Sequence, residues 1–137
     1  MTDAGENENA VSDLNRQIAR EAMEIASEAC GVCFSEMTAP NRKRAKVSFA
    51  RQLAMYLCHV VGQIPMSEIS IVFKRDRSTV GYACHMIEDR RDGAFFNAQL
   101  EFMEAEMRER MRIVMVRSQA RFVSSHAIRR ARAALAR

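Results

Sequence analysis

The side chains best suited to chemistry lie in one short polar stretch of the sequence, Lys74 to Thr79. It holds two arginines, an aspartate and two hydroxyl side chains in succession. An arginine can donate two hydrogen bonds to a guanine, an aspartate can accept one from a cytosine amino group, and a hydroxyl can reach a phosphate or a thymine methyl. These residue types therefore indicate contact with bases and phosphates.

Apolar residues with helical spacing flank this stretch and must position it. They are Met66, Ile69 and Phe73 before the turn, and Val80, Ala83, Cys84 and Ile87 after it. The outward face of the second helix would carry Arg77, Ser78, Gly81, Tyr82 and His85. Asp76 or Ser78 is expected to cap that helix, and Asp92-Gly93 to end it. We interpret the pair as a helix-turn-helix whose second helix enters a DNA major groove.

Two further helices are predicted ahead of this pair. One begins at about Leu14, with Ser12 or Asp13 as its cap, and fades by Gly31. The other spans about Val47 to Val61, and Gly62 is placed to end it. Its core side is expected to be Phe49, Leu53, Tyr56 and Val60.

A basic loop is expected between these two helices, over about Ser35 to Lys46. It contains four cations within residues 42–46, namely Arg42, Lys43, Arg44 and Lys46. Such a run is often only a solvated loop. Beside a helix-turn-helix it also fits phosphate contacts, which give much of the affinity for DNA.

Several of these segments resemble the C-terminal DNA-binding domain of the bacterial replication initiator DnaA. The matching residues are Arg51-Gln52-Leu53-Ala54-Met55-Tyr56-Leu57, Glu68-Ile69, Phe73, Arg75-Asp76-Arg77-Ser78-Thr79-Val80 and Ala83. The resemblance implies that residues 75–79 contact the major groove and phosphates. It also implies that one of Arg42, Lys43 and Arg44 enters the minor groove, with Lys43 favoured by the gap-free alignment.

Three departures from the family pattern fall in or near the part that reads bases. Arg77 stands where the family usually has histidine, Ser70 replaces a glycine, and Lys74 alone separates Phe73 from Arg75 where two residues are usual. A target other than the unaltered initiator box is therefore expected.

The resemblance and the residues together predict sequence-specific binding of double-stranded DNA by a transcriptional regulator. The expected DNA-binding residues are Arg42, Lys43, Arg44, Lys46, Lys74, Arg75, Asp76, Arg77, Ser78, Thr79 and Tyr82. Two alternatives stay open: control of replication initiation by competition at initiator-type boxes, and a protein-interaction scaffold that uses a methionine-rich helix.

That methionine-rich helix is predicted over 94–117, after Gly93. Its apolar stripe is Phe96, Leu100, Met103, Met107, Met111 and Val114. The stripe either folds back on the domain as core or forms a homodimer through Phe96, Leu100, Met103, Met107 and Met111. An arginine-rich tail, 118–137, follows, and residues 108–137 hold nine arginines against Glu109. Such a tail could add DNA affinity or bind the acidic N-terminal residues.

The fold class expected is all-α: a helix-turn-helix bundle with an appended C-terminal amphipathic helix. The domain organisation is an acidic, disordered N-terminus (1–12), the DNA-binding domain (13–93), the methionine-rich helix and the tail. No apolar run reaches 18 residues and no secretion signal is evident, which favours a cytoplasmic, nucleoid-associated protein with no membrane partner.

Catalytic and cofactor chemistry have little support in the sequence. There is no phosphate-binding loop of the G-x-x-x-x-G-K-[ST] type and no nucleophile–histidine set, so no enzyme activity and no cofactor are expected. Cys30 and Cys33 form a C-x-x-C pair, but no second pair follows at the spacing of a structural zinc site. We therefore expect reduced thiols and no metal.

Overall fold

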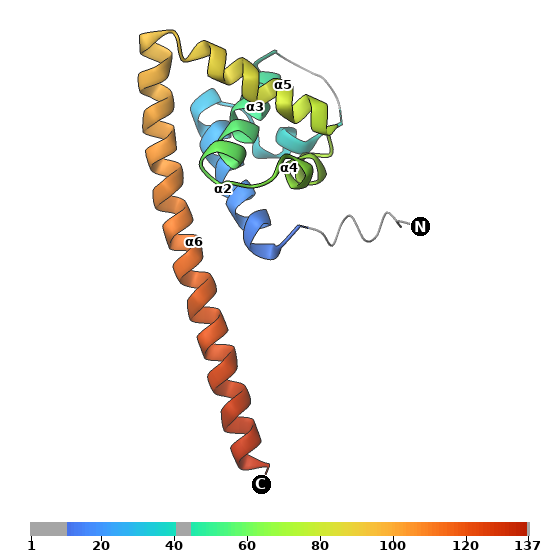
Figure 1. Ribbon diagram of the computed structural model, residues 1–137, viewed down its shortest axis with the longest axis vertical. Coiled ribbons are helices and arrows are strands. Elements are labelled where there is room, and N and C mark those ends of the chain that lie inside the picture. Colours follow the sequence, from blue (N-terminus) through green and yellow to red (C-terminus); the bar gives the residue numbers. More distant parts are fainter. Residues whose placement is uncertain (1–10, 41–44, 137) are drawn as a thin grey trace.

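The computed structural model describes residues 11–40 and 45–136, and in that part the chain forms helices and no strands. The elements are α2 (Asp13–Cys30), the short 3-10 helix η1 (Phe34–Thr38), α3 (Ala45–Val60), α4 (Met66–Phe73), α5 (Arg77–Arg90) and α6 (Ala94–Leu135). Figure 1 shows α2 to α5 gathered in one bundle, with α6 running along it. The expected all-α class is confirmed. The acidic residues 1–10 and the loop residues 41–44 lie outside the described part.

Local sequence signals set most helix ends. Ser12 caps α2, because its hydroxyl accepts a hydrogen bond of 3.1 Å from the amide of Asn15. Gly31 ends α2 in the left-handed conformation, at φ 64°. Gly62 follows α3 at a close approach, since a Cβ there would lie 2.6 Å from the carbonyl oxygen of Cys58. That separation is too short for any larger residue to be accommodated without a shift of the backbone.

The core is centred on α3, which packs against α2 on one side and α5 on the other. Leu53, Tyr56 and Leu57 of α3 are buried, as are Ile69 and Phe73 of α4. Val80, Ala83 and Ile87 provide the buried face of α5, as their spacing predicted. One predicted core residue is wrong: Val60 is 43% exposed, because α3 ends there and the chain turns toward Pro65.

The segment predicted as a loop begins with the 3-10 helix η1. Met37, near its C-terminal end, is fully buried and anchors the segment to the bundle. A single apolar anchor in a polar stretch has no periodicity, so sequence patterns do not reveal it.

The predicted helix over 94–117 continues without a break to Leu135. No glycine or proline follows Gly93, and the tail is rich in alanine and arginine, both strong helix formers. Figure 1 shows the second half of α6 extending well beyond the bundle. From Met115 to Ala136 every residue is exposed except Ser118, which is half-buried.

The methionine-rich stripe of α6 packs inside the chain, against α2. Leu100 and Met107 are completely buried, and Phe96, Met103 and Met111 are half-buried against the same core. Of the two roles expected for this stripe, core packing and dimer formation, the structure shows core packing. A homodimer through these five side chains is not shown, because in this conformation they pack against the core of the same chain.

Two polar clusters attach α6 to the bundle. Arg91 donates to the Tyr56 hydroxyl at 2.8 Å and pairs with the buried Glu104 at 3.0 Å. Further along, Arg110 lies 3.3 Å from carboxylate oxygens of both Glu21 and Glu24 of α2. These contacts fix which face of α6 meets the bundle.

Within residues 11–40 and 45–136, no helix is long and apolar enough to cross a membrane.

Candidate nucleic-acid interface

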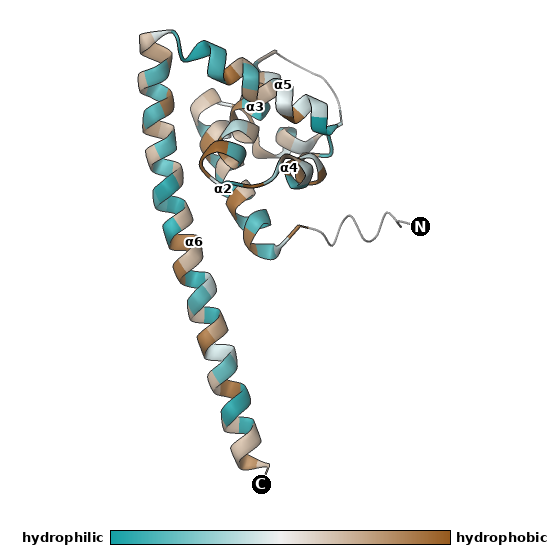
Figure 2. Cartoon of the chain, viewed as in Figure 1, coloured by the Kyte–Doolittle hydropathy of each residue, from teal (hydrophilic) through white to brown (hydrophobic). Residues whose placement is uncertain are grey.

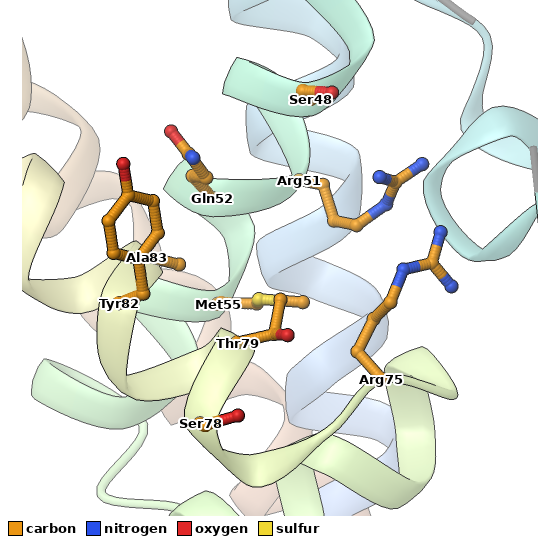
Figure 3. A pocket seen from close by; sticks show the side chains of 9 residues that line it. All are labelled: Ser48, Arg51, Gln52, Met55, Arg75, Ser78, Thr79, Tyr82 and Ala83. Atoms are coloured by element: carbon orange, nitrogen blue, oxygen red, sulfur yellow. The ribbon is translucent and has the colours of Figure 1, made fainter. Parts of the chain in front are cut away.

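The helices α3 and α5 enclose a hollow of about 480 Å³ on the surface of the bundle. Its lining comprises Ser48, Arg51, Gln52 and Met55 from α3, Arg75 from the turn, and Ser78, Thr79, Tyr82 and Ala83 from α5. Figure 3 shows the two arginine side chains at one end of this hollow and Gln52 and Tyr82 at the other. Most of the lining residues have polar side chains, and Arg51 and Arg75 are cationic, which favours an anionic ligand.

The first turn of α5 carries the residues expected to read bases. Asp76 occupies the N-cap position, although its side chain makes no capping bond. Arg77, Ser78 and Thr79 follow and are all exposed. The amides of Arg77 and Ser78 precede the first helical hydrogen bonds, which run from Thr79 and Val80 to the Asp76 carbonyl. These free amides and the helix dipole favour an anion at this end of α5.

The outward face of α5 is largely as predicted. Tyr82 is 59% exposed at the rim of the hollow, and His85 is exposed one turn further on, 3.4 Å from Asp89. Gly81 is the exception. It is half-buried, and a Cβ there would lie 3.9 Å from the sulfur of Met66, so Gly81 faces α4.

Arg75 serves the fold as well as the surface. Its Nη2 donates to the carbonyl oxygen of Ala39 at 2.7 Å, and its Nη1 to the carbonyls of Phe73 and Lys74 at 3.2 Å. Because carbonyls are neutral, these bonds leave the guanidinium charge in place. Arg75 thus holds the turn before α5 to the chain that follows η1.

Arg51 binds the same segment from α3. It is only 6% exposed and donates from Nε to the carbonyl of Met37 at 2.9 Å and from Nη2 to that of Glu36 at 3.2 Å. Burial, and then the positive charge of Arg75, lower the pKa of Arg51. The two guanidinium groups point toward η1 together in Figure 3. They place a concentrated positive charge beside the entry to the basic loop.

The other predicted DNA-binding residues occupy different positions. Lys74 is exposed at the end of α4, in the left-handed conformation at φ 55°. Lys46 does not line the hollow; its ammonium would lie 3.4 Å from a Cβ on Gly31, at the C-terminal end of α2. A cation is favoured there by the helix dipole. Arg42, Lys43 and Arg44 lie outside the described residues.

Sequence reasoning had not assigned Ser48, Arg51, Gln52 and Met55 to the site. These residues recur on α3 at spacings of three and four, which puts them on one face of the helix. This spacing is visible in the sequence, but the stripe mixes polar and apolar side chains and so does not identify a buried or an exposed face. Only the packing of α5 beside it shows that it lines a surface.

The cysteines do not form a metal site within residues 11–40 and 45–136, where no three metal-ligating side chains come together. All four cysteines are free thiols. Burial raises the pKa of Cys84 to about 11 and raises those of Cys58 and Cys30 as well. Raised pKa values keep these thiols protonated and poorly reactive near neutral pH.

Comparison with protein families matches residues 19–87, half of the chain, to the bacterial dnaA protein helix-turn-helix family. Among curated proteins, the chromosomal replication initiator protein DnaA of Tropheryma whipplei is 35% identical over 69 residues. That of a Picosynechococcus species is 36% identical over 66 residues. The aligned segments cover 50% and 47% of this chain but only 14% of either relative.

Two solved structures share the fold. A crystal structure of a DNA replication initiation factor aligns with a TM-score of 0.65 and 26% identity, over 72% of this chain and 30% of that one. Replication initiator DnaA bound to AMPPCP and single-stranded DNA aligns with a TM-score of 0.62 and 26% identity, over 71% and 30%. The expected resemblance is confirmed.

Proposed function

Because the chain belongs to the bacterial dnaA protein helix-turn-helix family, we propose that it binds double-stranded DNA with sequence preference. In this proposal α5 lies in the major groove and the basic loop contacts the adjacent backbone or minor groove. The observation that carries it is the first turn of α5, where Arg77, Ser78 and Thr79 are exposed beside a cationic hollow. Such a helix end is the usual reader in a helix-turn-helix.

The residues divide into three proposed roles. Arg77 reads a base edge, with Asp76 beside it as an acceptor for a cytosine amino group. Ser78, Thr79 and Tyr82 contact phosphate or the thymine methyl. The cations Arg42, Lys43, Arg44, Lys46, Lys74 and Arg75 supply phosphate contacts, and one of the three loop residues 42–44 enters the minor groove.

We propose that this DNA binding serves to control transcription. We also propose that the protein is cytoplasmic and associated with the nucleoid. The chain spans only 14% of its initiator relatives, and that part is the helix-turn-helix. The chain departs from the family pattern at Ser70, Lys74 and Arg77. These departures favour a DNA target that differs from the initiator box. Competition at initiator-type boxes is the alternative outcome for the same site.

A selection from randomised duplexes with the purified full chain tests the proposal. We expect one enriched motif, and we expect Arg77→Ala to lose preference at a single position of it. Arg129→Ala, which removes the same charge from the far end of α6, is the matched control and should return the wild-type motif. Enrichment of an unaltered initiator box would favour replication control. If no motif were enriched, the proposal of sequence-specific DNA binding would be refuted and a protein-interaction scaffold would be favoured.

A further inference from the structure

α6 has a second apolar face, which borders α2 and α3 at Phe95 and Phe102 and continues along the free half of the helix. It comprises Phe95, Phe102, Ile113, Val116 and Val123, together with the small residues Ala98, Ala105, Ala120 and Ala127. Phe95 is 79% exposed, Phe102 77% and Val123 64%. Figure 2 shows brown, hydrophobic positions recurring along α6 far beyond the bundle. Exposed aromatic and aliphatic side chains in a line are a feature of interaction surfaces.

The spacing of this face is that of a coiled-coil seam. Phe95, Phe102, Val116 and Val123 fall on one seven-residue repeat, and Glu109 occupies the middle position of that repeat. A sustained seven-residue repeat is the pattern by which two helices supercoil around each other. A single charged residue at one such position commonly sets the alignment of the pair.

The charge of α6 is divided between its two halves. Residues 94–109 hold four glutamates and one arginine, a net charge of −3. Residues 110–136 hold seven arginines and no acid, a net charge of +7. A parallel pair would place like charges side by side along its whole length. An antiparallel pair places the acidic half of each helix against the basic half of the other.

One antiparallel alignment satisfies both the shapes and the charges. With the twofold axis between Glu109 and Arg112, Val116 faces Ala105 of the other copy and Val123 faces Ala98. In the same alignment Phe102 lies beside Ala120 of the other copy and Phe95 beside Ala127, each within one residue of the position directly opposite. The four large side chains on the seven-residue repeat thus each have an alanine next to them, which lets the helices approach closely.

The centre of this alignment is self-complementary. Within one chain, Arg112 already pairs with Glu109 at 2.7 Å, and both side chains are exposed. Around the axis, each Glu109 would also lie beside Arg112 of the other copy, so that four charges alternate in sign. The paired stretch from Phe95 to Ala127 is about 48 Å long at 1.5 Å per residue.

We propose that the chain forms a homodimer in which α6 packs antiparallel on α6 of a second copy, through the face Phe95, Phe102, Val116 and Val123. The methionine-rich stripe keeps its intramolecular place against α2. The hollow between α3 and α5 takes no part in this contact. The inference is therefore independent of DNA binding.

Sedimentation equilibrium on the full chain, without DNA, tests the dimer at micromolar concentration. We expect twice the monomer mass for the wild type. Val116→Glu should weaken dimerisation about 100-fold, because it buries a charge at the centre of the contact. Phe122→Glu is the matched control: Phe122 is 70% exposed on a different face of the same free half, and dimerisation should be unchanged. A monomeric wild type, or equal effects of the two variants, would overturn the proposal.

A charge exchange tests the orientation. Glu109→Arg alone should weaken the dimer about tenfold, since like charges then surround the axis, and adding Arg112→Glu should restore it. In a parallel pair Glu109 faces its own copy, so the single change would leave affinity unaltered and refute the antiparallel arrangement. Circular dichroism on each variant should show unchanged helix content, because every substituted residue is exposed.

Discussion

Arg75 donates a hydrogen bond of 2.7 Å to the carbonyl oxygen of Ala39, and this bond joins the turn before α5 to the segment that leads into the basic loop. Arg51 reinforces it through the carbonyls of Met37 and Glu36. The two parts of the chain that we propose to contact DNA are therefore held to each other by the interior of the bundle.

Arg75→Lys tests this connection because it keeps the charge and removes the fork of donors. A lysine cannot bond the Ala39, Phe73 and Lys74 carbonyls together, so we expect a loss of about 1–2 kcal/mol in the free energy of unfolding. DNA affinity should fall for every sequence alike. Urea denaturation and fluorescence anisotropy measure the two effects. If Arg75 acted only through its charge, both values would match the wild type.

Arg77→Ala tests base reading at the exposed first turn of α5. We expect a cost of about 1–3 kcal/mol in binding to the selected motif and a relaxed preference at one base pair. Stability should be unchanged, because Arg77 is exposed. Binding to a panel of single-base variants measures the preference. An equal loss on every duplex would assign Arg77 to phosphate instead.

The paired change Lys43→Ala with Arg44→Ala tests the basic loop. Weaker binding is expected on all sequences, with the slope of log affinity against log salt reduced by about 0.9 for each phosphate that the loop no longer neutralises. Arg129→Ala with Arg132→Ala removes the same charge from the free end of α6 and is the control. Equal slopes for the two double variants would mean that only net charge matters.

The hydroxyl of Tyr56 should make stability depend on pH in the alkaline range. Burial, and then its hydrogen bond to Glu88, raise the pKa of Tyr56 from 10.0 to about 12. The folded state therefore retains a proton that the unfolded state releases, and about 2–3 kcal/mol of stability should be lost between pH 10 and 12. Urea titrations of the wild type and Tyr56→Phe measure it. The phenylalanine variant should lack that part of the decline, and parallel curves would contradict the assignment.

Lys74→Gly should stabilise the fold. Lys74 ends α4 at φ 55° and ψ 47°, a left-handed conformation that costs a side chain about 1–2 kcal/mol. After the larger unfolded-state entropy of glycine is allowed for, we expect a gain of about 0.5–1 kcal/mol. Lys74→Ala removes the same side chain without relieving the backbone and should give no gain. A higher melting temperature for the alanine variant would show that charge, and not backbone strain, is responsible.

Much of the bundle follows from the sequence because the signals are local. The spacing of Ile69, Phe73, Val80 and Ile87 identifies the buried faces of α4 and α5, and Ser12 and Gly31 mark both ends of α2. The outward placement of Arg77 to Thr79 then follows from helical geometry alone. Each of these depends on residues within one or two turns of each other.

The tertiary structure decided what depends on residues far apart in the chain. Arg51 and Arg75 carry the same charge in the sequence as Arg77, but packing turns Arg51 toward carbonyls of η1 and Arg75 toward the Ala39 carbonyl just after it, and leaves Arg77 exposed. Likewise α6 has two apolar faces, and the sequence contains no local rule for choosing between them. The contacts of Arg91 with Glu104 and of Arg110 with α2 select the methionine-rich face for the core and leave the Phe102 face exposed.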